Sequence, residues 1–190
     1  ICSGPRSGKQ FTYALLEERV PRARTLTREE SLAELVRRYF TSHGPAMVKD
    51  FVWWSGLTVA DARAGIEMAG STLARETSDG KTYWVPSHAQ TARRNPHPAH
   101  LLPAYDEALL SYRDNRGAYA AHMGQLMRDS GQTIVIDGRA VGTWRRTISD
   151  SELMVQVKPF TRLSRRETQA IAEAADRYGA FLNLDARLIR

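Results

Sequence analysis

The first residues of this chain that could do chemistry lie between Gly4 and Lys9, in the run G-P-R-S-G-K. A phosphate-binding loop needs glycine, four residues, Gly-Lys and then Ser or Thr, because amides and lysine hold phosphates while the hydroxyl binds magnesium. Here the spacer is one residue short, and Gln10 follows the lysine. Residues 11–13 carry aromatic rings and a hydroxyl, which favours a strand. The run therefore predicts a β-hairpin with a basic tip, formed by Arg6 and Lys9.

A second candidate is the run Trp144-Arg145-Arg146, which combines an aromatic ring with two guanidinium groups. Such a set can stack on bases and neutralise phosphates. Because side chains alternate along a strand, Arg145 should face away from Trp144 and Arg146, and should share a side with Arg139 if the strand is regular. A buried tryptophan beside solvent-facing arginines that pair with carboxylates is an equally open interpretation.

Adjacent carboxylates at Asp106 and Glu107, near Arg113, have residue types suited to acid–base catalysis. Adjacent carboxylates more often cap a helix or pair with arginine, so we expect a structural ion pair. Three histidines lie near one another in sequence but lack a cysteine or acidic partner at metal-ligand spacing: His88, His97 and His100. We therefore expect neither a metal site nor a cofactor.

The first half of the chain has the pattern of three helices. Residues 28–43 carry apolar side chains at helical spacing, with Thr27 and Glu30 in capping-box positions and Gly44 after the last turn. A second helix is predicted over residues 46–55 and a third over residues 59–69, capped by Thr58. Of the two adjacent tryptophans in the second helix, we expect one to be buried and the other partly buried.

Two short strands follow these helices, at residues 71–77 and 82–86, joined by an Asp-Gly turn. Three helices and a hairpin predict a winged-helix domain over residues 27–87. Its third helix offers Thr58, Asp61, Arg63 and Glu67 outside the apolar positions, and its wing offers Arg75 and Lys81. Two of those four helix side chains are acidic, so a structural spacer is as well supported as a DNA-reading helix.

The remaining segments complete the predicted domain organisation. Residues 1–26 match the later hairpin roughly and are interpreted as the remnant wing of a preceding winged-helix unit in a longer protein. Residues 88–100 are polar and proline-containing, and predict a linker. Residues 101–190 predict a small antiparallel β-rich domain, with a loop and short helix at 116–130, a hairpin through Asp137-Gly138, and a terminal helix capped by Ser164. The predicted fold class is α+β.

Composition points to an anionic partner. The 190 residues carry 27 basic and 21 acidic side chains, a net charge of +6, which suggests nucleic acid first. Arginine greatly outnumbers lysine, a bias that a GC-rich genome could also produce. The single cysteine fits a reducing cytoplasm, and no apolar run reaches the roughly 18 residues that span a membrane.

Three longer stretches carry a resemblance to a known family. They are R-Y-F-T-S-H-G-P-A-M-V-K-D-F-V-W-W-S-G-L at 38–57, L-L-P-A-Y-D-E-A-L-L-S-Y-R at 101–113, and V-G-T-W-R-R-T-I at 141–148, followed by V-K-P-F. In this order they resemble winged-helix DNA-binding proteins related to the AlkZ and YcaQ DNA glycosylases, over residues 1 to about 184. Such proteins are about twice as long, with tandem winged helices and a β-rich C-terminal domain, and characterised members excise alkylated bases.

The resemblance implies binding to double-stranded DNA but supplies no catalytic residue. The family's catalytic signature is Gln-x-Gln or Gln-x-Asp, and none of the six glutamines here makes that motif. The expected function is the DNA-binding C-terminal part of a winged-helix DNA glycosylase-like protein that acts in repair of alkylated or crosslinked bases. The expected DNA contacts are basic or hydroxyl side chains: Arg6, Lys9, Thr58, Arg63, Arg75, Lys81, Arg139, Arg145 and Arg146. The alternative is a non-enzymatic winged-helix regulator or a protein-interaction module.

Overall fold

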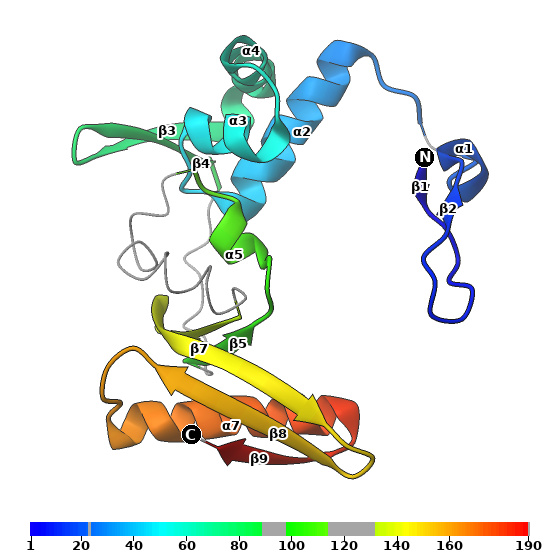
Figure 1. Ribbon diagram of the computed structural model, residues 1–190. Helices are drawn as coiled ribbons and strands as arrows, with labels where there is room; N and C mark the ends of the chain where they lie inside the picture. Colours follow the sequence, from blue (N-terminus) through cyan, green and yellow to red (C-terminus); the bar gives the residue numbers. More distant parts are fainter. Residues whose placement is uncertain (23, 89–97, 114–131, 190) are drawn as a thin grey trace.

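The structure, a computed structural model, describes residues 1–22, 24–88, 98–113 and 132–189. Figure 1 shows an N-terminal hairpin, a group of helices with a second hairpin, and a five-stranded sheet packed on a long helix. The fold is therefore α+β, as predicted. Among the described helices, none combines the length and the apolar composition needed to cross a membrane.

The N-terminal hairpin forms as predicted. Strands β1 (Cys2–Ser3) and β2 (Tyr13–Ala14) pair antiparallel, and a bridge between Ser7 and Gln10 continues the ladder toward the tip. Gly8 turns the chain there with φ of +60°, a conformation that glycine adopts without strain. A single helical turn, α1 (Leu16–Arg19), follows. The hairpin stands apart from the helices in Figure 1, joined to them by an extended segment.

The helical unit, residues 27–87, has three helices and a hairpin in the predicted order. Its elements are α2 (Arg28–His43), α3 (Val48–Ser55), α4 (Val59–Ala69), the 3-10 turn η1 (Gly70–Thr72), β3 (Leu73–Ser78) and β4 (Lys81–Pro86). Capping boxes start α2 and α4 at the predicted residues, Thr27 and Thr58. Helix α3 begins two residues later than predicted, because Ala46 pairs with Trp84 of β4 instead of entering the helix.

A continuous core holds the helical unit together, and its largest fully buried side chains are aromatic: Tyr39, Phe40 and Phe51. Helices α2 and α4 approach closely at Gly65, where an added Cβ would lie 2.5 Å from Val36 Cγ2. The prediction that one of the paired tryptophans is buried is wrong. Trp53 is 61% exposed and Trp54 is 37% exposed, because Phe51 fills the core-facing side of α3 and the tryptophans turn toward α5 (Glu107–Leu110).

The sheet unit consists of five strands in sequential order and a long helix. Its elements are β5 (Ala99–Leu102), β6 (Thr133–Ile136), β7 (Arg139–Ile148), β8 (Glu152–Pro159), α7 (Arg165–Leu182) and β9 (Asp185–Ile189). The predicted hairpin through Asp137-Gly138 and the Ser164 capping box of α7 are confirmed. The predicted loop and short helix at 116–130 lie outside the described residues, as do residues 89–97 of the predicted linker.

Two expectations for this unit are wrong. The sheet is not wholly antiparallel, because α7 carries the chain back along the sheet and β9 then pairs parallel with β8. A strand–helix–strand connection of this kind produces parallel neighbours. The linker does not extend to residue 100, because Ala99 and His100 pair with β6 and Ala99 is buried under α7.

Helix α7 covers one face of the sheet. The core between them includes Ile134, Trp144, Leu153 and Val155 from the strands and Ile171 from the helix. Partners in the strand registers share a face, so the opposite face carries the alternate residues of each strand. We call this opposite side the open face.

Candidate nucleic-acid interface

The tip of the N-terminal hairpin carries two of the expected DNA contacts. Arg6 and Lys9 are both exposed. The Arg6 guanidinium lies 4.7 Å from the centre of the Phe11 ring, a cation–π arrangement that keeps its polar edge in solvent. The Thr12 hydroxyl donates to the carbonyl of Pro5 and braces the turn. The tip therefore presents two cations.

The N-terminus of α4 is occupied by intramolecular contacts. Thr58 Oγ1 accepts a hydrogen bond from the backbone amide of Asp61, at 3.1 Å, and donates one to its carboxylate at 2.6 Å. That carboxylate also binds Arg28 Nη2 at 2.6 Å. Hydrogen bonds from Thr58, followed by Arg28, lower the pKa of Asp61. The acidic side chain that made this helix a poor phosphate site is thus balanced by Arg28, which the sequence pattern did not reveal.

The other expected contacts of the helical unit lie at the surface. Arg63 and Glu67 are exposed on α4. In the hairpin, Arg75 lies opposite Trp84, and Lys81 lies opposite Ser78 beside the turn. Both hairpin cations are exposed, so they are available to a partner, with Glu67 as an opposing charge on the helix.

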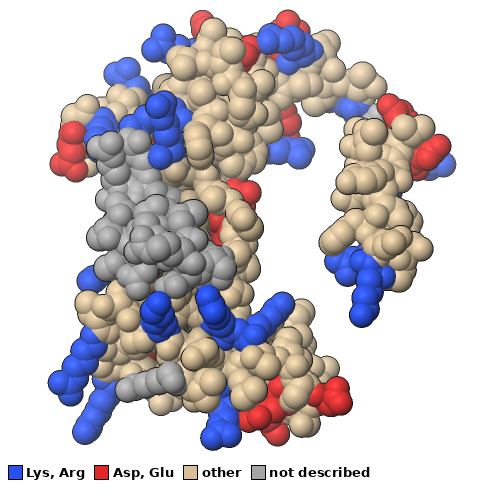
Figure 2. All heavy atoms as spheres, in the orientation of Figure 1, with Lys and Arg blue, Asp and Glu red and all other residues tan. Residues whose placement is uncertain are grey.

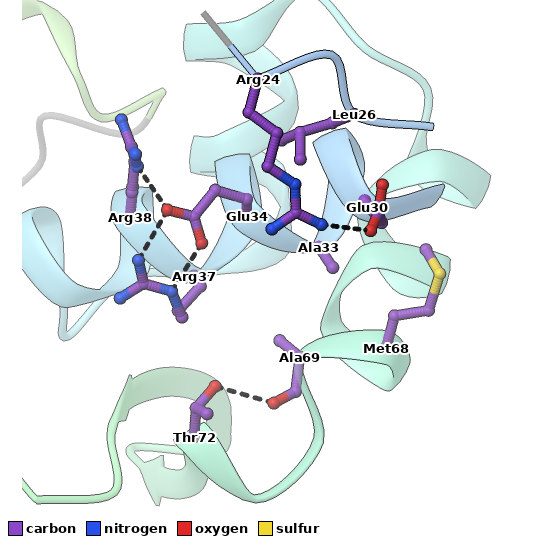
Figure 3. A pocket seen from close by; sticks show the side chains of 10 residues that line it. All are labelled: Arg24, Leu26, Glu30, Ala33, Glu34, Arg37, Arg38, Met68, Ala69 and Thr72. Atoms are coloured by element: carbon purple, nitrogen blue, oxygen red, sulfur yellow. Dashed lines mark hydrogen bonds and ion pairs between the residues drawn. The ribbon is translucent and has the colours of Figure 1, made fainter. Parts of the chain in front are cut away.

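A groove of about 660 Å³ lies between α2, the end of α4 and the segment before α2 (Figure 3). Its arginines are already matched with carboxylates. Arg24 binds Glu30 at 2.8 Å, and Glu34 receives hydrogen bonds at 2.7 Å from both Arg37 and Arg38. These bonds lower the pKa of Glu34 to about 2. The groove is therefore lined by ion pairs and presents few uncompensated cations.

The adjacent carboxylates Asp106 and Glu107 have structural roles, but among the described residues neither forms the expected ion pair with arginine. Asp106 caps α5 by accepting a hydrogen bond from the amide of Ala108 at 2.9 Å. Glu107 accepts hydrogen bonds from Ser111 and from Trp54 Nε1, and its carboxylate lies 3.6 Å from His43 Nε2. Ser111, then Trp54 and His43, lower the pKa of Glu107. The carboxylate thus joins α5 to the helical unit.

Among the residues that the structure describes, the Arg113 side chain forms no ion pair with Asp106 or Glu107. Its backbone amide donates to Asp50, which is buried and also caps α3. Within the described residues, no group of three or more His, Cys, Asp or Glu side chains could hold a metal ion.

A bulge in β7 rearranges the expected arginine surface. The register with β6 pairs Ala140 with Val135 but Gly142 with Ile134, so Val141 is an extra residue. An extra residue shifts the alternation of side chains by one. Arg139 therefore lies on the sheet face that α7 covers, where hydrogen bonds from Ser164 and then the charge of Arg139 lower the pKa of Glu167. Arg139 does not share a side with Arg145, as a regular strand would predict.

The Trp-Arg-Arg run is divided between the two faces of the sheet. Trp144 is 4% exposed and donates a hydrogen bond to the carbonyl of Leu102 at 2.8 Å, so it cannot stack on a base. Arg146 lies 5.5 Å from the Tyr178 ring centre at the edge of α7. Arg145 projects from the open face, opposite Gln156 of β8. The same register puts Lys158 and Arg187 on that face. Arg187 was missed because β9 was not predicted.

A family model and a solved structure both match this chain. The family model described as DNA glycosylase AlkZ-like matches residues 1–181. Among solved structures, Streptomyces sahachiroi DNA glycosylase AlkZ superposes with a TM-score of 0.75 at 24% identity, over 99% of this chain and 54% of the AlkZ chain. The chain thus spans about half the length of that protein. None of the curated proteins matches it. With nearly its whole length matched by one family model, the chain belongs to the AlkZ-like DNA glycosylase family.

Proposed function

We propose that this chain holds duplex DNA for a base-excision protein of the glycosylase type. The observation that carries the proposal is the family match over residues 1–181, in a chain with a net charge of +6. In this reading, residues 27–87 act as a winged helix and residues 1–26 are the wing of a preceding unit. The sheet unit follows as the β-rich C-terminal domain.

The proposed division of labour follows from the chemistry of base excision. An enzyme that hydrolyses a glycosidic bond must take the damaged base out of the stack and position a water at the sugar. A surface of cations that contacts phosphates supplies the grip on the duplex, without itself breaking bonds. The candidate contacts are exposed and basic: Arg6, Lys9, Arg63, Arg75, Lys81 and Arg145.

The test is a fluorescence anisotropy titration of the whole chain with a labelled duplex at several salt concentrations. We expect weak binding whose affinity falls steeply as salt rises, because each neutralised phosphate releases counterions. Absence of binding even at low salt would contradict the proposal for this chain. A parallel assay for release of an alkylated base should give none, since the chain lacks the Gln-x-Gln and Gln-x-Asp motifs.

One observation favours the second candidate, a winged-helix regulator or protein-interaction module. Large apolar side chains of the N-terminal hairpin are exposed, with Phe11 at 74% and Tyr13 at 82%. Exposed apolar patches commonly mark contacts with protein. The double variant Phe11→Ser/Tyr13→Ser should leave duplex affinity unchanged if the hairpin contacts protein. A loss of duplex affinity in this variant would place the two rings against DNA.

A further inference from the structure

We propose that the exposed part of the open face binds the phosphate backbone of duplex DNA through Arg145, Lys158 and Arg187. This inference rests on the proposed function and deepens it, because it assigns the sheet unit a DNA surface of its own. Lys158 and Arg187 are not among the contacts that the sequence suggests.

The strand registers bring the three cations together around Gln156. Arg145 of β7 is the direct partner of Gln156, and Lys158 lies two residues further along β8. Arg187 of β9 is the partner of Met154, two residues away in the other direction. Adjacent strands lie about 4.8 Å apart, and alternate residues of a strand lie about 6.6 Å apart. The Cα atom of each basic residue therefore lies within about 8 Å of the Cα atom of Gln156. The β7–β8 hairpin and the later strand β9 thus build one basic cluster.

The cluster is exposed, and two of its members form no ion pair with any residue that the structure describes. Arg145, Lys158 and Arg187 are all exposed, as is Gln156 between them. Within the described residues, Arg145 and Arg187 form no ion pair. The nearest carboxylates on this face, Glu152 and Asp185, form the next row beyond Met154 and Arg187. Arg145 and Arg187 therefore keep charges that an external anion can balance.

The distribution of charge over the sheet sets the limits of this surface. Helix α7 lies behind β7 and β8 in Figure 1, so Figure 2 looks onto the open face. In this view, separate Lys and Arg side chains project around the sheet unit, while acidic side chains collect at one end. Asp150 lies in the turn between β7 and β8, and Glu152 begins β8. Toward β6, the open face carries Thr133, Val135 and Thr143, which are buried. The exposed cations therefore occupy a bounded strip.

The chemistry of the strip fits a nucleic-acid backbone better than a protein. Protein interfaces need a fully buried apolar or aromatic centre. Between the cations, this strip offers Thr147 and Gln156, with Met154 as its partly buried apolar residue. Arginine, lysine, threonine and glutamine side chains are the usual donors to phosphate oxygens. Contacts to phosphate oxygens alone would hold the duplex without selecting its sequence.

The experiment compares two double variants with equal loss of charge in the whole chain. Arg145→Gln/Arg187→Gln removes two cations from the open face. Arg165→Gln/Arg166→Gln removes two exposed cations at the start of α7, on the other side of the sheet. Affinity for a labelled duplex is measured by anisotropy against salt. We expect the first variant to lower the slope of log K against log salt by about 1.8 and affinity at least tenfold near 0.1 M salt. The control should keep nearly the wild-type slope.

The other outcomes separate this inference from the proposed function. Equal losses in both variants would mean attraction by overall charge and would overturn the assignment of the open face. If Arg75→Gln/Lys81→Gln weakens duplex binding and Arg145→Gln/Arg187→Gln does not, the assignment of the open face is overturned while the proposed function stands. Wild-type chain that binds no duplex would overturn both. Binding of poly-glutamate, but not duplex, through Arg145 and Arg187 would assign the face to an acidic protein. Unchanged thermal unfolding of both variants shows that folding is not the cause.

Discussion

In the helical unit, Arg28, Arg37 and Arg38 each meet a carboxylate oxygen at 2.6 or 2.7 Å, whereas in the sheet unit Arg145 and Arg187 form no ion pair with the described residues. The two units contain the same residue type in opposite electrostatic settings. Asp61 offsets the charge of Arg28, and Glu34 offsets one of the two charges of Arg37 and Arg38, while Arg145 and Arg187 keep their full charge. A basic composition alone does not locate a DNA-binding surface.

The difference follows from the geometry of the two kinds of secondary structure. Residues three and four apart share a helix face, so Glu34 reaches both Arg37 and Arg38 within a single turn. A strand places alternate residues on one side, and the register with the adjacent strand decides which side chains lie beside them. The pairing of Gln156 with Arg145 leaves that arginine beside a neutral partner. Sheet registers therefore decide which charges are left over.

The largest expected effect comes from testing whether the two units are separate cores. Phe51 is fully buried in the helical unit and Leu153 is fully buried under α7. We expect Phe51→Ala to destabilise the helical unit by about 3–5 kcal/mol, because the truncation leaves a cavity. Hydrogen exchange should show lost protection in α2 and α4 while β7 and β8 stay protected. Leu153→Ala should give the reverse pattern. Equal loss in both units for either variant would mean that they unfold as one.

Much of the fold could be predicted from local signals. The capping residues Thr27, Thr58 and Ser164 and the two Asp-Gly turns are short-range patterns, and each lies where the sequence indicates. The parallel strand β9 was missed because its existence depends on α7 returning the chain to β8. The strand at Ala99 was missed because its polar surroundings hid a pairing with β6. Long-range pairing has no signature within a few residues.

The candidate site was harder to predict for the same reason. The sequence suggests that Arg139 and Arg145 share a side, but a bulge at Val141 separates them. It also places Thr58 among the DNA contacts, although the hydroxyl is bound by the cap. Arg187 joins the open face through β9, which only the folded sheet reveals. The sequence shows which residues are charged. The interaction partner of each residue and the sheet face on which it lies depend on the strand registers, which only the structure gives.

A smaller effect concerns Thr58, which separates a capping role from a DNA contact. Thr58→Ala removes both hydrogen bonds to Asp61, and we expect a loss of about 1 kcal/mol in the free energy of unfolding. Ser164→Ala in α7 is the matched change in the sheet unit and should have a similar effect. Urea unfolding measures both losses. Duplex affinity measured where each variant is fully folded should stay at the wild-type value. A loss specific to Thr58→Ala would return this hydroxyl to the DNA interface.

The smallest effect is a dependence on pH that the paired carboxylates give to the helical unit. The folded pKa of Glu34, about 2, lies below its ordinary value of 4.5, because Arg37 and Arg38 donate to the charged carboxylate. A lowered folded pKa means that the unfolded chain binds the proton first. The contribution of Glu34 to stability is therefore complete above about pH 4.5 and is lost as the pH falls toward 2.

Glu34→Gln should accordingly weaken the acid dependence of the urea midpoint in this pH window, with a small loss at neutral pH because exposed ion pairs contribute little. Glu67→Gln is the control, since it removes an exposed carboxylate of the same unit that forms no ion pair with the described residues. Arg37 and Arg38 would then resemble Arg145, as cations without a carboxylate. If Glu34→Gln also strengthens duplex binding, the pairing of arginines is what keeps DNA away from α2; unchanged binding would show that α2 lies outside the interface whatever its charge.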